Sequence, residues 1–279
     1  MRIGIVGLGL IGGSLGFDLK TLGFEVYGVS RQQETCRKAV ELGIIDKAST
    51  ELSILLEAEL VFVCTPLSTI VSTIKQLTPF LEPETIITDV GSVKQSIVAE
   101  CSPLWANFVG GHPMAGTAEQ GIEAAQKDLF KGAAYVLTPT ENTNQESLAR
   151  VREIALKLNS RVYLSNPEEH DQAVAWISHL PVMISASLID SCMGENDKEI
   201  LSLAQHLASS GFRDTSRVGG GNPELGLMMA KYNREKLLRS LQYYRHSLDK
   251  ITQSIEERKW QELEHILQNT RDNKPNFLH

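Results

Sequence analysis

A glycine-rich turn follows the first apolar segment of the chain and constrains its fold more than any other feature. Residues 2–6 are short, apolar and β-branched, which predicts a buried strand, and Gly7, Gly9 and Gly12 follow at once in G-x-G-x-x-G spacing. Residues 14–22 then have the pattern of a helix. In such a unit the first glycine allows the tight turn, the second lets backbone approach a pyrophosphate, and the third lets helix and strand pack closely.

This strand–turn–helix unit predicts a dinucleotide site. The amides of Leu10 and Ile11 are expected to point at the phosphates, where the helix dipole favours negative charge. The alternative is a glycine-rich turn that binds no ligand.

The second predicted strand, residues 24–29, bears on which dinucleotide binds. NAD sites usually carry an acidic residue about 20 residues after the glycine turn, where it accepts from the ribose 2′-hydroxyl. Here the strand ends at Ser30 and Arg31, and Thr35 follows at the start of the next helix. An arginine fork and two hydroxyls suit a 2′-phosphate, so we predict NADP as the cofactor. The alternative is a solvated Arg31 that also tolerates NAD.

Strand and helix signals alternate through the first half of the chain and then stop. The alternation predicts a Rossmann-type α/β domain, in which a doubly wound, mainly parallel sheet is covered on both faces. After about residue 166 helical periodicity takes over, which predicts an all-helical second domain. The expected domains are 1–165 and 166–279. The further predicted strands are 58–64, 85–90, 108–111, 134–138 and 162–165.

Composition excludes several classes of function. The chain has 279 residues and a net charge of −7, with no cluster of lysine and arginine. We therefore expect neither nucleic acid nor a membrane as partner. The four cysteines are widely spaced and form no metal-binding pattern with histidine, so no metal is predicted. The same spacing, without a targeting segment, predicts reduced thiols in a cytoplasmic protein.

His112 is the leading candidate for a catalytic base. It stands between Gly110-Gly111 and Pro113, directly after a predicted strand. Ligands of open parallel sheets bind beyond the carboxyl ends of the strands, so this histidine is expected to face the ligand crevice. A neutral imidazole there can accept the proton of an alcohol while the alcohol loses hydride. The alternative is a structural histidine.

Two other strand ends are expected at the same edge of the sheet. Cys64, Thr65 and Pro66 follow one strand, and Gly91 and Ser92 follow the next. We expect Cys64, Thr65, Pro66 and Gly91 to contact the cofactor. Ser92 is expected to bind the substrate hydroxyl or to orient His112; as an alternative, or in addition, it caps the following helix.

The helical half contains candidate substrate-binding residues. Arg213 and Arg217 lie four residues apart beside a triple glycine, a pattern that suits carboxylate capture. As alternatives, these arginines end a helix or pair with Asp214. His170 and His206 are predicted to be structural or surface residues.

The sequence resembles the prephenate/arogenate dehydrogenase family over nearly its whole length. The resemblance is carried by the glycine turn and by four further blocks, of which Asp-Val-Gly-Ser-Val-Lys, Gly-His-Pro-Met-Ala-Gly and Ser-His-Leu-Pro in that order are the most specific. Those blocks are residues 89–94, 111–116, 178–181 and 213–217.

The resemblance implies a nucleotide-binding domain followed by a helical domain that forms a homodimer. It also implies oxidative decarboxylation of a cyclohexadienyl carboxylate. The family's catalytic histidine falls on His112, its hydroxyl-binding serine on Ser92 and its carboxylate-binding arginine on Arg217. His179, in the Ser-His-Leu-Pro block, and Thr117 are further candidates for substrate contact.

Two departures from the family pattern bear on the substrate. Val182 stands where many relatives have a second histidine. Many relatives also have an acidic residue shortly after the Gly-His-Pro-Met-Ala-Gly block, whereas here Thr117 and Ala118 come before the first acidic residue, Glu119. Loss of a histidine that could bind a pyruvyl group favours L-arogenate, which would give L-tyrosine, over prephenate, which would give 4-hydroxyphenylpyruvate.

Two rival functions remain. One is a β-hydroxyacid dehydrogenase, which would need a lysine as its acid/base group; Lys198, Lys231 and Lys236 are available, but none lies in a matching motif. The other is a non-catalytic NADP(H)-binding sensor, which would need no base at position 112.

Overall fold

A computed structural model describes residues 1–117 and 119–277. The chain divides into two compact units, Met1–Asn233 and Arg234–His279. The domain boundary near residue 166 that the sequence indicates lies inside the first unit and stays a prediction.

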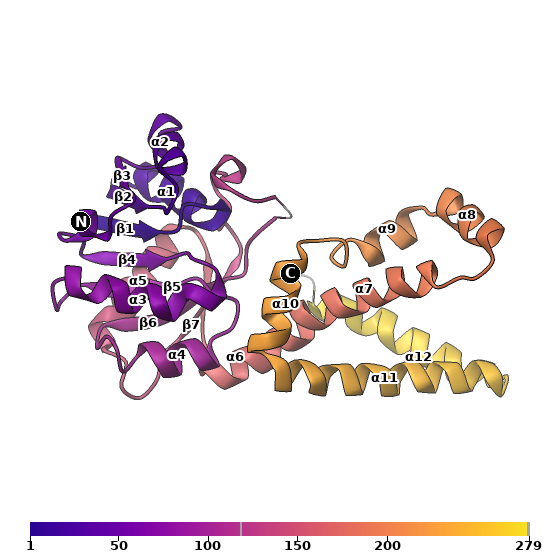
Figure 1. The fold of residues 1–279 in the computed structure, drawn as a ribbon. Helices are drawn as coiled ribbons and strands as arrows, with labels where there is room; N and C mark the ends of the chain where they lie inside the picture. The colour runs from indigo at the N-terminus through magenta and orange to yellow at the C-terminus, as the bar shows by residue number, and fades with distance from the viewer. Residues whose placement is uncertain (118, 278–279) are drawn as a thin grey trace. The chain divides into compact units, whose positions relative to one another are not determined.

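Eight strands of the first unit form one sheet in the order β3-β2-β1-β4-β5-β6-β7-β8 (Figure 1). Neighbouring strands are parallel except β6 and β7, which are antiparallel. The predicted Rossmann-type, mainly parallel sheet is confirmed. The strands are β1 Arg2–Val6, β2 Glu25–Val29, β3 Lys47–Ser49, β4 Leu60–Val63, β5 Ile86–Asp89, β6 Phe108–Pro113, β7 Ala134–Thr138 and β8 Arg161–Leu164.

Helices cover both faces of the sheet, and this explains why its central strands are almost wholly apolar. On one face the core includes Leu15 and Val151, and on the other it includes Ile74 and Ile97. The helices that supply these residues are α1 Leu10–Thr21, α3 Ile70–Leu77, α4 Gln95–Cys101 and α5 Gln145–Lys157. Helix α2, Gln33–Glu41, also packs on the sheet through its buried residues Cys36 and Ala39.

The strand order reverses between β1 and β4, which places a topological switch point beside the glycine turn. From β1 the chain runs outward to β2 and β3, then crosses back to β4 on the other side of β1. The connections on the two sides leave in opposite directions, and ligands of open α/β sheets bind at such a point, beyond the carboxyl ends of the strands. The fold therefore presents the glycine turn to a ligand at this edge.

The structure differs from the sequence prediction at helix α1, which begins at Leu10 rather than at residue 14, and at two strands. The short strand β3 (Lys47–Ser49) was not predicted, because three residues of mixed polarity carry no period-2 signal. Strand β6 continues through His112 to Pro113 instead of ending before them, because β7 pairs with it in antiparallel register from Gly110 to Pro113.

From residue 165 to 277 the structure contains helices and turns but no strand, so the prediction of a helical C-terminal part is confirmed. In the first unit these helices are α6 Pro167–Val174, the π-helix Ala175–His179, α7 Leu180–Met193, α8 Lys198–Leu207, α9 Ser210–Ser216 and α10 Pro223–Tyr232. The second unit consists of α11 Arg234–Glu256 and α12 Trp260–Asn273, which pack on each other, and a last 3₁₀ turn, Lys274–Phe277.

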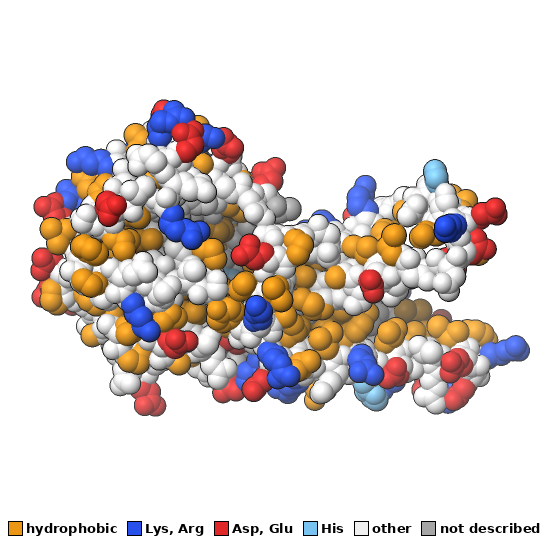
Figure 2. Space-filling view, viewed as in Figure 1, with side chains coloured by type: hydrophobic (Ala, Val, Ile, Leu, Met, Phe, Trp, Pro, Cys, Tyr) orange, Lys and Arg blue, Asp and Glu red, His pale blue; other side chains and the backbone are white. Residues whose placement is uncertain are grey.

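The continuous helical segment Pro167–Met193 is long and apolar enough to cross a membrane by length and composition. Such a segment is weak evidence for a span, because core helices of soluble proteins pass the same test. Only 28% of its most apolar window is buried within the chain. Figure 2 shows apolar side chains along the helical C-terminal part. On α8, Ile200, Leu203 and Leu207 are each more than half exposed.

A buried ion pair holds the carboxyl ends of β5 and β6 together. The Lys94 ammonium contacts the Asp89 carboxylate and also donates to Gly111 O at 2.9 Å, and both charged side chains are fully buried. Asp89 in turn accepts from the amides of Gly91 at 2.8 Å and Gly111 at 3.2 Å. The pair therefore fixes the loop that carries Ser92 relative to the strand that carries His112.

Replacing Lys94 by methionine should destabilise the protein strongly. The substitution leaves the Asp89 carboxylate buried without its cation, a loss that typically costs about 3–5 kcal/mol. Urea unfolding followed by circular dichroism measures the change. Lys157→Met is the matched control, because Lys157 pairs with Glu153 in an exposed position on α5 and should matter little. Equal, small effects of the two substitutions would show that the buried pair does not hold this edge.

Candidate active site

Two glycines of the N-terminal turn are required by the protein's own packing. Gly7 has φ +102°, and a Cβ there would lie 2.6 Å from Cys64 O. A Cβ on Gly12 would lie 2.0 Å from Gly7 O. A side chain at either position would therefore clash with backbone.

Gly9 differs, because a Cβ there would meet no atom of the protein within 4 Å. It is the N-cap residue of α1, and within the described residues no side chain caps that helix. The first amides of α1, including those of Leu10 and Ile11, are thus left for an acceptor from outside the chain. Open space beside uncapped amides fits the pyrophosphate of a dinucleotide.

Of the predicted 2′-phosphate residues, Ser30 and Arg31 lie in the turn after β2 and Thr35 lies in the first turn of α2. Ser30 Oγ accepts from the Gln32 amide at 3.3 Å, and Thr35 Oγ1 donates to the Gln32 side chain at 3.2 Å. Arg31 is exposed and forms no ion pair within the part of the chain that the structure describes. Its guanidinium is therefore available to an anion.

The other expected cofactor residues follow the strands next to β1. Cys64 continues the pairing of β4 with β1, since its amide donates to Val6 O at 2.7 Å. Thr65 and Pro66 come next, and Gly91 follows β5. All four stand at the carboxyl edge that also carries the glycine turn.

His112 lies near the end of β6 with only 7% of its surface exposed. Its Nδ1 lies 2.8 Å from His170 Nε2, and its Nε2 makes no hydrogen bond to any described residue. Burial holds the pKa of His112 well below its usual value of 6.5, and the nearby His170, Lys94 and His179 act in the same direction. At neutral pH the imidazole is therefore uncharged, which is the form a general base needs.

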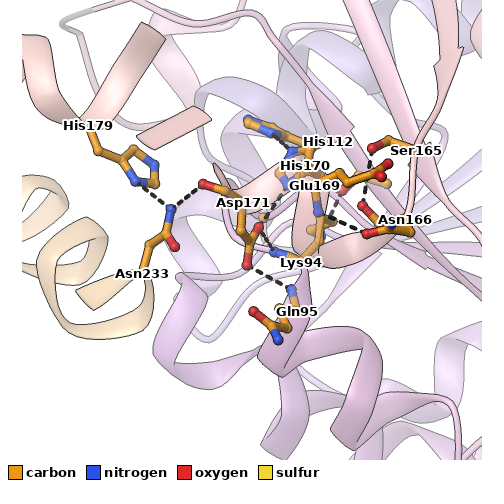
Figure 3. A network of polar contacts seen from close by, with 12 residues as sticks. Lys94, Gln95, His112, Ser165, Asn166, Glu169, His170, Asp171, His179 and Asn233 are labelled. Atoms are coloured by element: carbon orange, nitrogen blue, oxygen red, sulfur yellow. Dashed lines mark hydrogen bonds and ion pairs between the residues drawn. The ribbon is translucent and has the colours of Figure 1, made fainter. Parts of the chain in front are cut away.

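His170 extends this contact into a buried chain of polar groups (Figure 3). Its Nδ1 lies 2.8 Å from Asp171 Oδ1. The Asp171 carboxylate also accepts from the backbone amides of Lys94 at 2.7 Å and Gln95 at 2.9 Å. His170, which the sequence pattern predicts to be a structural or surface residue, lies in direct contact with His112.

Ser92 lies in the loop between β5 and α4. The structure contradicts the alternative that this serine caps α4, because the helix begins at Gln95 and the Asp171 carboxylate binds its first amides. Ser92 Oγ makes no hydrogen bond to the described residues. The hydroxyl is therefore available to a ligand.

The two candidate arginines lie at the end of α9. Arg213 is largely exposed, and its Nε lies 3.2 Å from Asp214 Oδ1, in agreement with the alternative prediction that it pairs with Asp214. Arg217 is the residue that ends α9 and is also exposed. It has no ion-pair partner among the described residues.

Thr117 is exposed, and its hydroxyl accepts from the Glu119 amide at 3.2 Å. Ala118, which belongs to the departure from the family pattern noted above, lies outside the described residues.

His179 ends the π-helix and is fully buried. Its Nδ1 lies 3.2 Å from Asn233 Nδ2, which also donates to Asp171 O at 2.7 Å, while its buried Nε2 has no partner among the described residues. Burial lowers the pKa of His179 to about 4, against the opposing charge of Asp171, with His170 lowering it further. Like His112, it is uncharged at neutral pH.

Comparison with known proteins agrees with this arrangement. Residues 15–164 match the model of the prephenate dehydrogenase nucleotide-binding domain, and residues 166–269 match that of the prephenate dehydrogenase dimerization domain. The chain belongs to the prephenate/arogenate dehydrogenase family. It is accordingly an oxidoreductase with a nucleotide-binding dehydrogenase domain and a dimerization domain of that family.

Individual members of the family cover almost all of the chain. It is 33% identical to the prephenate dehydrogenase of Bacillus subtilis (strain 168) over 260 residues, which is 91% of this chain and 70% of that protein. The crystal structure of Synechocystis arogenate dehydrogenase is 55% identical, with a TM-score of 0.90 and full coverage of both chains. The Aquifex aeolicus prephenate dehydrogenase bound to hydroxyphenyl propionate and NAD+ is 28% identical, with a TM-score of 0.94 and coverage of 99% and 98%.

Substituting alanine for each of two glycines should separate folding from cofactor binding. Gly12→Ala should destabilise the protein by about 1–3 kcal/mol, because overpacking against Gly7 O outweighs the better helix propensity of alanine. Gly9→Ala should keep the wild-type Tm but weaken dinucleotide binding about tenfold or more, equivalent to roughly 1.4 kcal/mol. Calorimetry measures both quantities. Unchanged dinucleotide affinity in Gly9→Ala would contradict the placement of the phosphates beside this residue.

Proposed function

We propose that the protein catalyses the NADP-dependent oxidative decarboxylation of L-arogenate to L-tyrosine, with His112 as the general base. The observation that carries the proposal is the state of His112. The imidazole is buried and uncharged at the ligand edge of a dinucleotide-binding sheet, with one nitrogen bonded and the other unbonded.

His112 Nε2 has the chemistry to take the proton of the substrate's ring hydroxyl. A bound nicotinamide cofactor supplies the hydride acceptor. As the carbinol becomes a carbonyl, the bond from the ring to its carboxylate breaks, CO₂ leaves, and the electron pair enters the ring. The carbonyl oxygen then takes back a proton and becomes a phenol. Aromatisation provides most of the driving force, so the protein's main task is to accept the first proton and hold the ring in place.

Two further residues suit the polar ends of this substrate. The unbonded hydroxyl of Ser92 would hold the ring hydroxyl against His112. Arg217, exposed and unpaired among the described residues, would bind a substrate carboxylate through its planar fork. Arg213 has a lesser part in this proposal, because Asp214 already engages it.

The preference for NADP rests on the turn after β2. No acidic residue stands at Ser30 or Arg31, so no carboxylate repels a 2′-phosphate, and the Arg31 guanidinium is exposed and unpaired among the described residues. NAD+ is the cofactor named for the Aquifex aeolicus relative. Because a relative binds NAD+, the activity of this protein with NAD and with NADP must be compared directly.

The preference for arogenate has two supports. One is the 55% identity with Synechocystis arogenate dehydrogenase over the whole chain. The other is Val182, which cannot hydrogen-bond a pyruvyl group.

We further propose a cytoplasmic homodimer that forms through the dimerization domain and covers the apolar side chains exposed in Figure 2.

A two-by-two assay tests the proposal. Prephenate and arogenate are each supplied with NAD or NADP, and reduced cofactor is followed at 340 nm. We expect the highest kcat/KM with arogenate and NADP. Turnover of prephenate alone would overturn the substrate assignment. Turnover of neither, with activity on a β-hydroxyacid or with no activity at all, would overturn the proposed reaction.

The variant Arg31→Ala adds a test of the cofactor assignment to the same assay. It should raise the KM for NADP at least tenfold and change the KM for NAD little, since only NADP carries the 2′-phosphate. Arg37→Ala is the matched control, because Arg37 lies on α2 and pairs with Glu34 and Glu41. Equal effects of Arg31→Ala on both cofactors would show that Arg31 does not bind the 2′-phosphate.

The pH dependence of kcat/KM should reflect the lowered pKa of His112. The base acts in its neutral form, and its pKa in the folded protein lies below 6.5 because burial disfavours the imidazolium. We therefore expect kcat/KM to be independent of His112 ionisation above pH 6.5 and to fall as the pH drops through that lowered pKa. An acid limb centred at or above pH 6.5 would contradict the burial of this group.

A further inference from the structure

The direction of each hydrogen bond around His112 follows from the chain of groups behind it. Three buried side chains are joined in sequence: His112 Nδ1 to His170 Nε2 at 2.8 Å, and His170 Nδ1 to Asp171 Oδ1 at 2.8 Å. The two imidazole rings meet edge-on, with an interplanar angle of 73°. Asp171 is 1% exposed and His170 3%, so water competes little for these bonds.

Asp171 fixes the far end of this chain as an acceptor. Its two oxygens accept from the backbone amides of Lys94 and Gln95, and a backbone amide can only donate. The start of α4 also favours a negative charge at this point. The Asp171 carboxylate therefore accepts from His170 as well, and His170 Nδ1 carries a proton.

Taking His170 and His112 both as neutral imidazoles, in which one nitrogen donates and the other accepts, fixes the remaining assignments. A doubly protonated His170 would instead donate to His112 Nδ1 and leave the proton on His112 Nε2, which the ¹⁵N experiment below would detect as the contrary result. With a proton on Nδ1, His170 presents the lone pair of Nε2 to His112. His112 Nδ1 must then be the donor, which leaves the lone pair on His112 Nε2. That nitrogen makes no hydrogen bond to a described residue.

We propose that His170 and Asp171 are positioning residues that hold His112 in the tautomer protonated on Nδ1, with Nε2 bare and directed at the substrate. The opposite tautomer would present an N–H to the substrate hydroxyl and could not remove its proton. The inference deepens the proposed function and rests on it for its catalytic meaning, although the tautomer itself can be measured without substrate.

The local structure around α6 supports this role. Asn166 caps the helix through the Glu169 amide at 2.8 Å, and Pro167 occupies its first turn. Asn233 donates to the Asp171 carbonyl at 2.7 Å. These contacts fix the backbone at both ends of the His170–Asp171 pair, so the two neighbouring side chains can face different partners, one on β6 and one on α4 (Figure 3).

The first experiment reads the tautomer directly. The full chain is labelled with ¹⁵N-histidine, and the imidazole signals of the substrate-free enzyme are recorded at neutral pH. The signal absent from His112→Ala identifies His112. We expect a protonated, pyrrole-type Nδ1 and an unprotonated, pyridine-type Nε2. A protonated Nε2 in the wild-type enzyme would overturn the proposal.

The second experiment compares His170→Gln with His170→Leu. The glutamine amide can still offer an oxygen to His112 Nδ1, whereas leucine cannot. His170→Leu should lose the Nδ1-protonated tautomer and about 10- to 100-fold in kcat, part of the range expected for a general base, with little change in KM. His170→Gln should recover most of both. Equal losses in the two variants would overturn the proposal, because a purely structural role does not depend on an acceptor atom.

Asp171→Asn tests the other end of the chain. Its amide would place a donor against at least one of the three N–H groups that now donate to the carboxylate, so the His170 tautomer should become mixed and kcat should fall with it. His206→Leu is the matched control, because His206 is exposed on α8 and bonds only the Ser202 carbonyl among the described residues. A wild-type His112 tautomer in both His170→Leu and Asp171→Asn would contradict the proposal.

Failure of this inference can be told apart from failure of the proposed function. If the wild-type enzyme turns over neither prephenate nor arogenate but shows the Nδ1-protonated tautomer, the proposed function fails and the tautomer assignment stands. If either substrate is oxidised while Nε2 of His112 carries the proton, the positioning role fails and the dehydrogenase activity stands.

Discussion

The hydrogen bond between His112 and His170 joins the sheet to the first helix of the C-terminal part, and the proposed chemistry of the site depends on it. His112 comes from β6, which the buried Asp89–Lys94 pair holds in place beside the loop of Ser92. His170 comes from α6, which is fixed at Asp171 by the first amides of α4. Three separate elements therefore determine the orientation of one imidazole ring.

The same buried setting explains why the imidazole is uncharged. Removal of water from the ring disfavours the imidazolium, and the Lys94 ammonium adds a repulsive charge. The proposed base has no carboxylate in direct contact, since His170 stands between His112 and Asp171.

Features that depend on neighbours in the sequence could be predicted, and those that depend on distant residues could not. Gly7 and Gly12 each meet a local packing requirement of the turn, and the apolar residues before Gly110 indicate the strand that carries His112. The contacts of His112 with His170 and of Lys94 with Asp171 join residues 58 and 77 positions apart. Nothing in the local pattern around His170 distinguishes it from an ordinary helix residue, although its position four residues after a capping Asn-Pro places it in a rigid first turn.

Strand β6 was predicted too short because its last residues are held by a distant strand. Its last residues pair only with β7, an antiparallel neighbour more than 20 residues later, and glycine and proline there read locally as a turn. The helical C-terminal part was predicted well because its 3.6-residue periodicity is a local signal. The exposure of the apolar side chains of α8 could not be foreseen from periodicity alone, because a helical pattern does not say what packs against its apolar face.

The most direct test of the account is the turnover of His112→Ala with arogenate and NADP, measured together with dinucleotide affinity. The account predicts that kcat falls by roughly 10²–10⁴-fold, the usual contribution of a general base, while the Kd for NADP stays at the wild-type value. His206→Ala, an exposed control, should leave both unchanged. A His112→Ala enzyme with near wild-type kcat would contradict the central role given to this histidine.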